Sequence, residues 1–355
     1  MRRIGKVVPL LVAVAAAPAV AAATPVAGTW QKVPAAPSAI FGSGAWTGKQ
    51  LVVVGRKPFT SVAVTESYDP ASKRWTQLPP PPKLADDVGC CKTLWSGKRL
   101  LAWGALSAAA FDPAANAWQP LDRTLPGGTL VWTGRDAIGW GGGCCGDANA
   151  DGAAYNPATG AFRKLARSPL APDQHPVGAW TGRELVLFVS GLTPDGKPYP
   201  ARLARGAAYN PATNTWRRLA PMPARGGSAV WDGHELLVAG AGTKADSVLA
   251  FNARTNHWRR LASAPSRIYA GTTVWTGKRL LLWNGQTGRN GLAYEPRTNR
   301  WSAIPRAPFR ARGGPIVAWT GRSLIVWGGE IGTPAGTSTP PKFPLDGGIF
   351  TPRVR

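Results

Sequence analysis

Common signals of several protein classes are missing from this sequence of 355 residues. It contains no Gly-x-Ser-x-Gly, no phosphate-binding loop and no dinucleotide-binding fingerprint, so no local motif indicates a serine hydrolase or a nucleotide-binding enzyme. No apolar run reaches the roughly 20 residues that a membrane-spanning helix needs. Acidic residues are scarce, because 18 Asp and Glu accompany 42 Lys and Arg, and the formal net charge is +24. This charge favours an anionic partner.

The longest apolar run lies near the N-terminus, in residues 7–17. Arg2, Arg3 and Lys6 precede it, and small residues suited to cleavage follow at 19–21 or 21–23. This order is typical of a secretory signal peptide. We therefore expect residues 1–23 to be removed and residues 24–355 to form one domain that is secreted or lies in the periplasm or cell envelope, without stable membrane insertion. A retained membrane anchor is the alternative, which the short run disfavours.

Two aromatic positions recur at one spacing along the chain. Tyr209 is followed by the turn residues Asn210 and Pro211 and, seven positions on, by Trp216. Five further pairs have the same spacing: Tyr68 and Trp75, Phe111 and Trp118, Tyr155 and Phe162, Phe251 and Trp258, and Tyr294 and Trp301. Exact repetition of this kind indicates an array of similar structural units.

A Trp-x-Gly motif lies upstream of the aromatic pairs. It occurs seven times, at Trp46, Trp95, Trp132, Trp180, Trp231, Trp275 and Trp319. A short apolar run bounded by turn residues follows each copy, which is typical of a buried strand. Each unit thus contains four strands, here called a to d. Such a unit cannot bury its faces alone, but it can in the radial array of a β-propeller.

The seventh unit ends before its d strand, and the missing strand is found at the other end of the chain. Residues 29–34 match residues 300–305, which begin the d strand of the sixth unit. The sequence therefore predicts an all-β, seven-bladed β-propeller of four-stranded blades in which the N-terminal strand completes the last blade. We expect a monomer.

The repeat resembles the kelch family in its doubled glycine after strand b, at 141–142 and 328–329, followed by Tyr or Phe and by Trp seven residues later. The resemblance covers residue 29 to the C-terminus, and only two repeats keep both glycines. It implies a propeller, but kelch members include intracellular adaptors, a secreted copper oxidase and sialic-acid mutarotases, so it implies no single activity. Of three histidines, His175 lies on one face and His234 and His257 on the other, so we expect no metal or cofactor. Residues 147–152 resemble the start of a calcium loop but lack its glutamate.

The two faces of the predicted disc differ. The a–b and c–d turns have fixed lengths, whereas the b–c and d–a loops vary, and repeat proteins concentrate such variation on the binding face. All 17 tryptophans occupy repeat positions, so none is left as a platform for sugars or bases. We call the b–c and d–a side the variable face and expect the ligand site there.

The d–a loops carry the candidate site residues. Arginines suit a carboxylate or phosphate, and paired carboxylates can serve as acid and base. The ligand-binding candidates are His175, Arg225, Arg267, Tyr269, Arg310 and Arg312, and the catalytic candidates are Asp86, Asp87 and Asp173. We expect a binding or scaffolding module for an extracellular or cell-envelope polysaccharide or protein, with an anionic one favoured. Alternatively, the protein is a sugar-acting enzyme resembling the sialic-acid kelch epimerases and mutarotases, or these residues are solvated.

The cysteines form two adjacent pairs, Cys90 with Cys91 and Cys144 with Cys145, in neighbouring repeats. Disulfides persist in exported proteins, so we expect these four residues to cross-link the repeats. Which cysteine pairs with which stays open, because adjacent strand residues point to opposite sides. A vicinal redox pair and a four-thiolate metal site are alternatives, although the spacing differs from the Cys-x-x-Cys of zinc sites.

Basic residues also follow the glycine of each Trp-x-Gly motif. The seven positions are Lys49, Lys98, Arg135, Arg183, His234, Lys278 and Arg322, and the fold would place them in a ring on the face opposite the variable face. They either solvate hairpin turns or bind an anionic ligand that high salt releases. Because basic residues recur at repeat positions and form no block, we expect no nucleic-acid binding.

Overall fold

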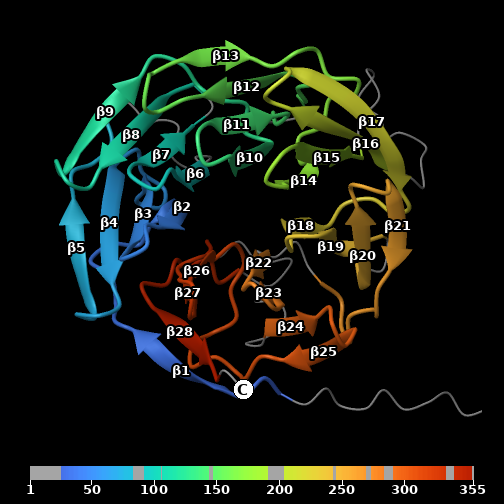
Figure 1. The fold of residues 1–355 in the computed structure, drawn as a ribbon. Coiled ribbons are helices and arrows are strands. Elements are labelled where there is room, and N and C mark those ends of the chain that lie inside the picture. Colours follow the sequence, from blue (N-terminus) through green and yellow to red (C-terminus); the bar gives the residue numbers. More distant parts are fainter. Residues whose placement is uncertain are drawn as a thin grey trace, which may run out of the picture.

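The computed structural model describes residues 25–82, 92–104, 106–143, 147–190, 204–242, 245–268, 273–283, 291–332 and 340–353. Within these ranges the chain forms 28 strands, and no helix in them is long and apolar enough to cross a membrane. The strands form seven separate four-stranded antiparallel sheets that stand around a common centre (Figure 1). The predicted all-β, seven-bladed propeller is confirmed.

The first four blades follow the chain in order. Blade 1 consists of β2 (Phe41–Trp46), β3 (Leu51–Arg56), β4 (Ala63–Asp69) and β5 (Arg74–Leu78). Blade 2 consists of β6 (Lys92–Trp95), β7 (Leu100–Trp103), β8 (Ala108–Asp112) and β9 (Ala117–Leu121). Blade 3 consists of β10 (Thr129–Trp132), β11 (Ala137–Trp140), β12 (Gly152–Tyr155) and β13 (Phe162–Lys164). Blade 4 consists of β14 (Val177–Trp180), β15 (Leu185–Val189), β16 (Ala204–Asn210) and β17 (Thr215–Met222).

The last three blades close the ring. Blade 5 consists of β18 (Ser228–Trp231), β19 (Leu236–Ala241), β20 (Ser247–Asn252) and β21 (His257–Arg260). Blade 6 consists of β22 (Thr273–Trp275), β23 (Leu280–Trp283), β24 (Gly291–Glu295) and β25 (Arg300–Ala303). Blade 7 consists of β26 (Ile316–Trp319), β27 (Leu324–Trp327) and β28 (Gly347–Pro352), and β1 (Gly28–Val33) pairs with β28 as its outer strand. The two chain ends thus complete one blade, as predicted.

The seven-residue aromatic spacing reflects the c–d hairpin. Tyr209 lies directly opposite Trp216 across β16 and β17, with ring centroids 5.0 Å apart. The hairpin turns at Asn214, whose φ of 53° lies in the left-handed region that asparagine tolerates. At the closing blade, Trp30 lies opposite Phe350 in the same way.

The d-strand tryptophans also join six of the seven blades to the one before, whereas blade 3 has Phe162 at this position. In each of the six, the indole N–H donates to a backbone carbonyl in or just after the d strand of the preceding blade. The six bonds are Trp30 to Pro305, Trp75 to Pro34, Trp118 to Pro79, Trp216 to Ala166, Trp258 to Ala220 and Trp301 to Ala262, at 2.7–3.2 Å. These tryptophans are therefore structural, as their regular spacing predicts.

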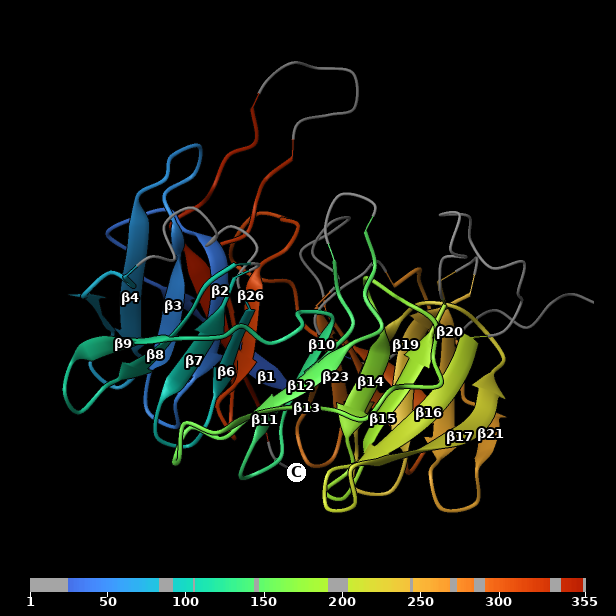
Figure 2. The ribbon, with the colours of Figure 1, turned by 90° about the horizontal axis from the view of Figure 1, so that it is seen from above.

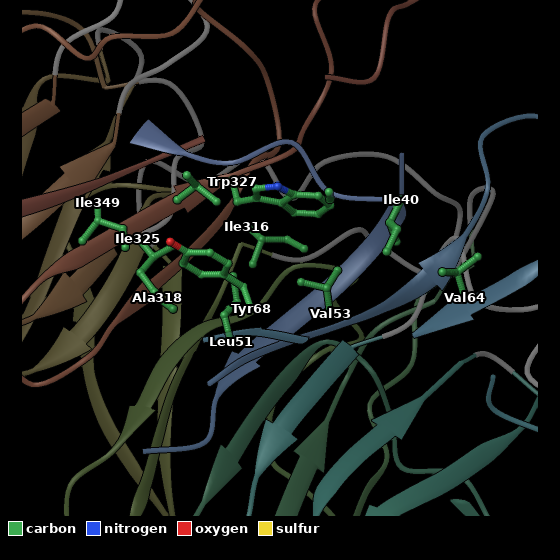
Figure 3. Packing of buried hydrophobic residues seen from close by; sticks show 12 residues of the cluster. Ile40, Leu51, Val53, Val64, Tyr68, Ile316, Ala318, Ile325, Trp327 and Ile349 are labelled. Atoms are coloured by element: carbon green, nitrogen blue, oxygen red, sulfur yellow. The ribbon is translucent and has the colours of Figure 1, made fainter. Parts of the chain in front are cut away.

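The cores lie between neighbouring blades, and strand b is buried on both sides because its sheet is covered by a blade on each face. Figure 3 shows the junction of blades 7 and 1, where Ile316, Ile325 and Trp327 gather against Leu51, Val53 and Tyr68. Burying one such side chain stabilises the fold by about 1.5–3 kcal/mol. Seven junctions of this kind hold the ring together.

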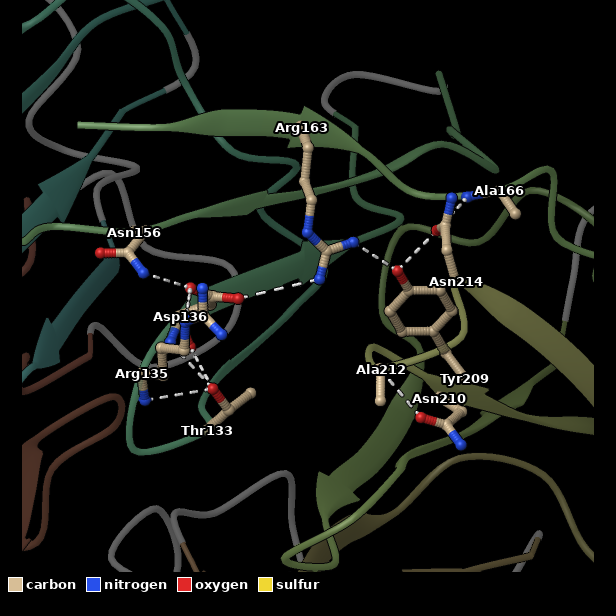
Figure 4. A network of polar contacts seen from close by, with 10 residues as sticks. All are labelled: Thr133, Arg135, Asp136, Asn156, Arg163, Ala166, Tyr209, Asn210, Ala212 and Asn214. Carbon is tan, nitrogen blue, oxygen red and sulfur yellow. Dashed lines mark hydrogen bonds and ion pairs between the residues drawn. The ribbon is translucent and has the colours of Figure 1, made fainter. Parts of the chain in front are cut away.

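Polar contacts reinforce the junction of blades 3 and 4 (Figure 4). Arg163 donates to the Tyr209 hydroxyl at 2.6 Å, and this hydroxyl donates to Asn214 Oδ1 at 2.7 Å. On its other side Arg163 lies 3.7 Å from the Asp136 carboxylate, which accepts a bond from Asn156. The c–d turns are thus tied to neighbouring blades by side chains as well as by packing.

Candidate functional site

Several predicted site residues lie outside the described part of the chain. These are Asp86, Asp87, Tyr269, Cys90, Cys91, Cys144 and Cys145. The catalytic pair and the disulfides therefore stay predictions, as does the signal peptide at residues 1–23.

Asp173 and Arg225 are brought together at Ser190, which immediately follows β15. Asp173 is buried, and its two carboxylate oxygens accept backbone N–H bonds from His175 at 2.8 Å and Ser190 at 2.7 Å. Arg225 donates to the Ser190 carbonyl at 2.9 Å. The backbone of Asp173 also bonds to the β11–β12 loop, because its carbonyl accepts from the Gly142 N–H and its N–H donates to the Asn149 carbonyl. Both charged residues therefore hold the bases of b–c loops.

Arg312 holds a b–c loop in blade 7. Its side chain is almost fully buried and lies over the ring of Phe309, 4.5 Å from the centroid. It donates to the carbonyl of Gly328, just after β27, and to the carbonyl and carboxylate of Asp346, just before β28. Arg312 thus fixes both ends of the β27–β28 loop.

The other described candidates are exposed. His175, Arg267 and Arg310 lie on d–a loops with exposed side chains. Arg312 belongs to the junction of blades 6 and 7, three blades further round than the Asp173–Ser190 contact, so the described structure does not gather these candidates into one pocket.

A different cluster stands out on the variable face, and we call it the aromatic–basic patch. It comprises Phe41, Arg56, Lys57, Phe59, Val62, Lys342, Phe343 and Leu345. Phe343, from the β27–β28 loop, lies edge-on to Phe41 at 5.9 Å and to Phe59 at 5.7 Å. The three rings come from three separate segments, so blades 7 and 1 build the patch jointly. Arg312 supports it, since it anchors the loop that carries Phe343.

Phe59 is the unusual member of the patch. It follows Pro58 in a tight turn that two backbone hydrogen bonds close. The Thr60 N–H donates to the Lys57 carbonyl, and the Lys57 N–H donates to the Val62 carbonyl. The φ of Phe59 is 60°. Glycine or asparagine is expected at such a position, because a left-handed conformation costs other residues about 1–2 kcal/mol. The Phe59 side chain is nevertheless 72% exposed. Neither backbone preference nor burial accounts for phenylalanine here.

The patch protrudes and is basic. Figure 2 shows the β3–β4 connection and the coloured parts of the β27–β28 connection extending beyond the strands on the same side. Arg56 lies over the Phe41 ring, 5.8 Å from its centroid, and Lys57 and Lys342 are exposed beside the aromatic rings. Val62 and Leu345 add exposed apolar surface at 51% and 37%. Exposed apolar surface rimmed by charge marks an interaction site.

Sequence reasoning did not single out this patch. The signal was present in Lys57-Pro58-Phe59, because proline favours the second turn position and leaves phenylalanine at the third, where glycine belongs. The contact between Phe59 and Phe343 joins residues almost 300 positions apart, and no local pattern reveals it.

Glu66 is a second residue that sequence reasoning missed. It is fully buried in β4 between Val64 and Tyr68, on the side that faces blade 7. Neither carboxyl oxygen makes a well-aligned hydrogen bond within the described structure, although the hydroxyl and the backbone N–H of Ser38 come close enough to lower the pKa of the carboxyl. Burial raises the pKa of Glu66, and Ser38 and Lys57 offset part of this shift. The equivalent positions of the other repeats hold Ala109, Ala153, Ala207, Leu249, Leu292 and Gly348.

Comparisons with known proteins support the fold alone. No protein-family model matches the chain, and no curated protein matches its sequence. Among solved structures, it is similar to a fungal alcohol oxidase of the AA5 family in complex with copper, with 14% identity and a TM-score of 0.66 over 92% of this chain and 76% of that one.

Within the nine described ranges, no group of three or more His, Cys, Asp or Glu side chains could hold a metal ion. His234 lies in the a–b turn of blade 5 and His257 beside its c–d turn, whereas His175 lies in a d–a loop on the other face. The three histidines do not fit a shared metal site.

Proposed function

We propose that this protein is an exported, kelch-like propeller that acts as a binding and scaffolding module, and that its aromatic–basic patch docks an acidic extracellular or cell-envelope protein. The observation that carries this proposal is Phe59, a ring held in a costly backbone conformation and displayed to solvent. Strain of this kind collects at functional sites, where the surrounding structure maintains it.

The composition of the patch favours a protein over a polysaccharide. Interface cores are enriched in aromatic residues and arginine, and a few such anchors dominate the binding energy. The rings of Phe41, Phe59 and Phe343 stand edge to face and offer no flat platform. Arg56, Lys57 and Lys342 would complement an acidic rim around the partner's apolar pocket.

The double glycines support the kelch-like reading. Gly328 and Gly329 have φ values of 64° and 85°, and a Cβ at Gly329 would lie 2.5 Å from the Gly313 carbonyl oxygen. Gly141 and Gly142 have φ values of 71° and 99°, and a Cβ at Gly142 would lie 2.7 Å from a backbone nitrogen of the β9–β10 loop. The motif is thus used where the end of strand b passes close to the neighbouring d–a loop.

Site-specific photo-crosslinking tests the proposal. A photoreactive phenylalanine at position 59 should give a defined adduct with an acidic protein on the producing cells, and the adduct should weaken as salt rises. The same probe at Lys98, on the opposite face, should give none. Equal adducts at both positions, or none at position 59, would remove the patch as the docking site.

Phe59→Gly separates binding from folding. Glycine suits a φ of 60°, so the thermal stability of this variant should be unchanged or slightly higher. Loss of the ring should reduce partner binding about tenfold or more, as measured with the partner identified by crosslinking. Full affinity in the stable variant would contradict the proposal.

A further inference from the structure

A groove on the face opposite the variable face lies between blades 4 and 5 and has a volume of about 680 Å³. The a–b turns of both blades, Arg217 of β17 and the c–d turn of blade 5 line it. Its size is within the range of small-molecule sites. It is far from the aromatic–basic patch, which belongs to blades 7 and 1.

Arg217 ties the wall of this groove together. Arg217 donates to both oxygens of Glu184, at 3.0 and 2.6 Å, and to the Ala253 carbonyl of the next blade at 3.3 Å. The hydrogen bond from Arg217 lowers the pKa of Glu184, so the carboxylate stays ionised and the pair adds no net charge. Arg217 therefore spans the two blades and fixes the turns that carry the other lining residues.

The remaining polar groups offer donors to a ligand. Arg183 of blade 4 and Arg254 of blade 5 line the groove from its two sides, and both are exposed. The Asn252 side-chain oxygen already accepts two backbone N–H bonds, so its amide NH₂ is what it offers. Trp231 occupies a repeat position, but it is only partly buried and contributes apolar surface to the groove, contrary to the expectation that every tryptophan is purely structural. His234 also lines the groove and is exposed.

We infer that this groove binds an acidic saccharide, whose carboxylate or sulfate group is held by Arg183 and Arg254 while its ring lies near Trp231. Guanidinium groups suit planar and tetrahedral anions, and an indole accepts the apolar face of a sugar ring. Because Arg183 and His234 are two of the seven ring positions, Arg135 and Lys278 flank the groove and would meet further acidic units. An acidic polysaccharide fits better than an isolated sugar.

Calorimetric titration of the purified protein tests this site. Tetragalacturonate and a heparin tetrasaccharide provide carboxylate and sulfate probes, and maltotetraose is the neutral control. We expect at least one acidic probe to bind and the neutral one not to bind. The double variant Arg183→Ala, Arg254→Ala should weaken binding at least tenfold, since a charged hydrogen bond is worth about this factor.

The matched control also removes two positive charges, at other positions of the same face. Lys49→Ala with Arg322→Ala, in blades 1 and 7, should change the affinity less than threefold. Equal losses in the two double variants would mean diffuse attraction to a basic surface and would overturn the site. Absence of binding by both acidic probes, or equal binding of maltotetraose, would also overturn it. Phe59→Gly should leave this binding intact, so failure here is distinct from failure of the protein-docking proposal.

Discussion

Replacing Glu66 with leucine should stabilise the protein. Its carboxyl is fully buried at the junction where the ring closes, and the approach of Ser38 gives it no well-aligned hydrogen bond in the described structure. Leucine has a similar size, and Leu249 and Leu292 occupy the equivalent positions in blades 5 and 6. The substitution therefore removes an unsatisfied polar group without opening a cavity.

The expected gain follows from the desolvation of the carboxyl. A buried polar group without a partner costs about 1–3 kcal/mol, so Glu66→Leu should add about 2 kcal/mol to the free energy of unfolding at pH 7. With an unfolding entropy of about 2.1 cal/mol/K per residue, this corresponds to a rise in Tm of about 3 °C.

Burial of the Glu66 carboxyl also predicts how the free energy of unfolding changes with pH. The pKa of Glu66 is raised above 4.5 in the folded protein, so folding favours the protonated form. The contribution of Glu66 to stability is therefore most favourable at or below pH 4.5 and falls as the pH rises through the folded pKa, above which the penalty is constant. Glu66→Gln cannot titrate, so its stability relative to the wild type should rise over this window.

Denaturant melts of the wild type and the Glu66 variants between pH 4 and 8 measure both effects. Glu330→Gln, at an exposed glutamate, is the matched control and should show no such trend. A destabilised Glu66→Leu, or a flat difference between wild type and Glu66→Gln, would mean that the carboxyl is satisfied and would refute the reasoning.

Two further substitutions test the roles given to the c–d turn of blade 1 and to the buried Arg312. Lys73 has a φ of 57° at a turn position that asparagine occupies in blades 2, 4, 5 and 6. Among the described residues, the buried Tyr68 hydroxyl has no partner like the one that Asn299 gives Tyr294. Lys73→Asn should thus add about 1 kcal/mol in a thermal melt, and a loss would show that the hydroxyl is not within reach. Arg312→Met should lower the free energy of unfolding by about 3 kcal/mol and reduce crosslinking at position 59, because the β27–β28 loop loses its anchor. Arg310→Met, at an exposed position, should change stability by less than about 0.5 kcal/mol. Equal effects of the two substitutions would refute the anchoring role of Arg312.

The fold could be predicted because its signals are local and repeated. The spacing from Tyr209 to Trp216 is fixed by one hairpin, and the same hairpin occurs in blades 1 to 6. Ring closure was also predictable, since Trp30 keeps the pattern of Trp301. What the spacing did not reveal is why tryptophan is needed, namely an indole N–H that reaches a carbonyl of the preceding blade.

The candidate site was less predictable, because a charge on a loop does not reveal its burial. Asp173 and Arg312 have the sequence context of ligand contacts, yet their side chains bond to loop backbones. Their contact with a ligand stays a prediction, although their geometry is that of positioning residues. The patch depends on Phe343 reaching Phe59 across the closing junction, which only the closed ring creates.

The departures from the repeat collect in blade 1. Phe59 strains a turn, Glu66 places a carboxyl in an apolar junction, and Lys73 replaces the asparagine that bonds the tyrosine hydroxyl in blade 6. Each departure costs stability, and all three lie in the blade that meets the non-covalently closed blade 7. Sequences that break local rules do so chiefly at functional sites. The junction of blades 7 and 1 should therefore be the first part of the ring to open, and hydrogen exchange should be faster in β4 and β28 than in β16 and β20, where the repeat pattern is intact.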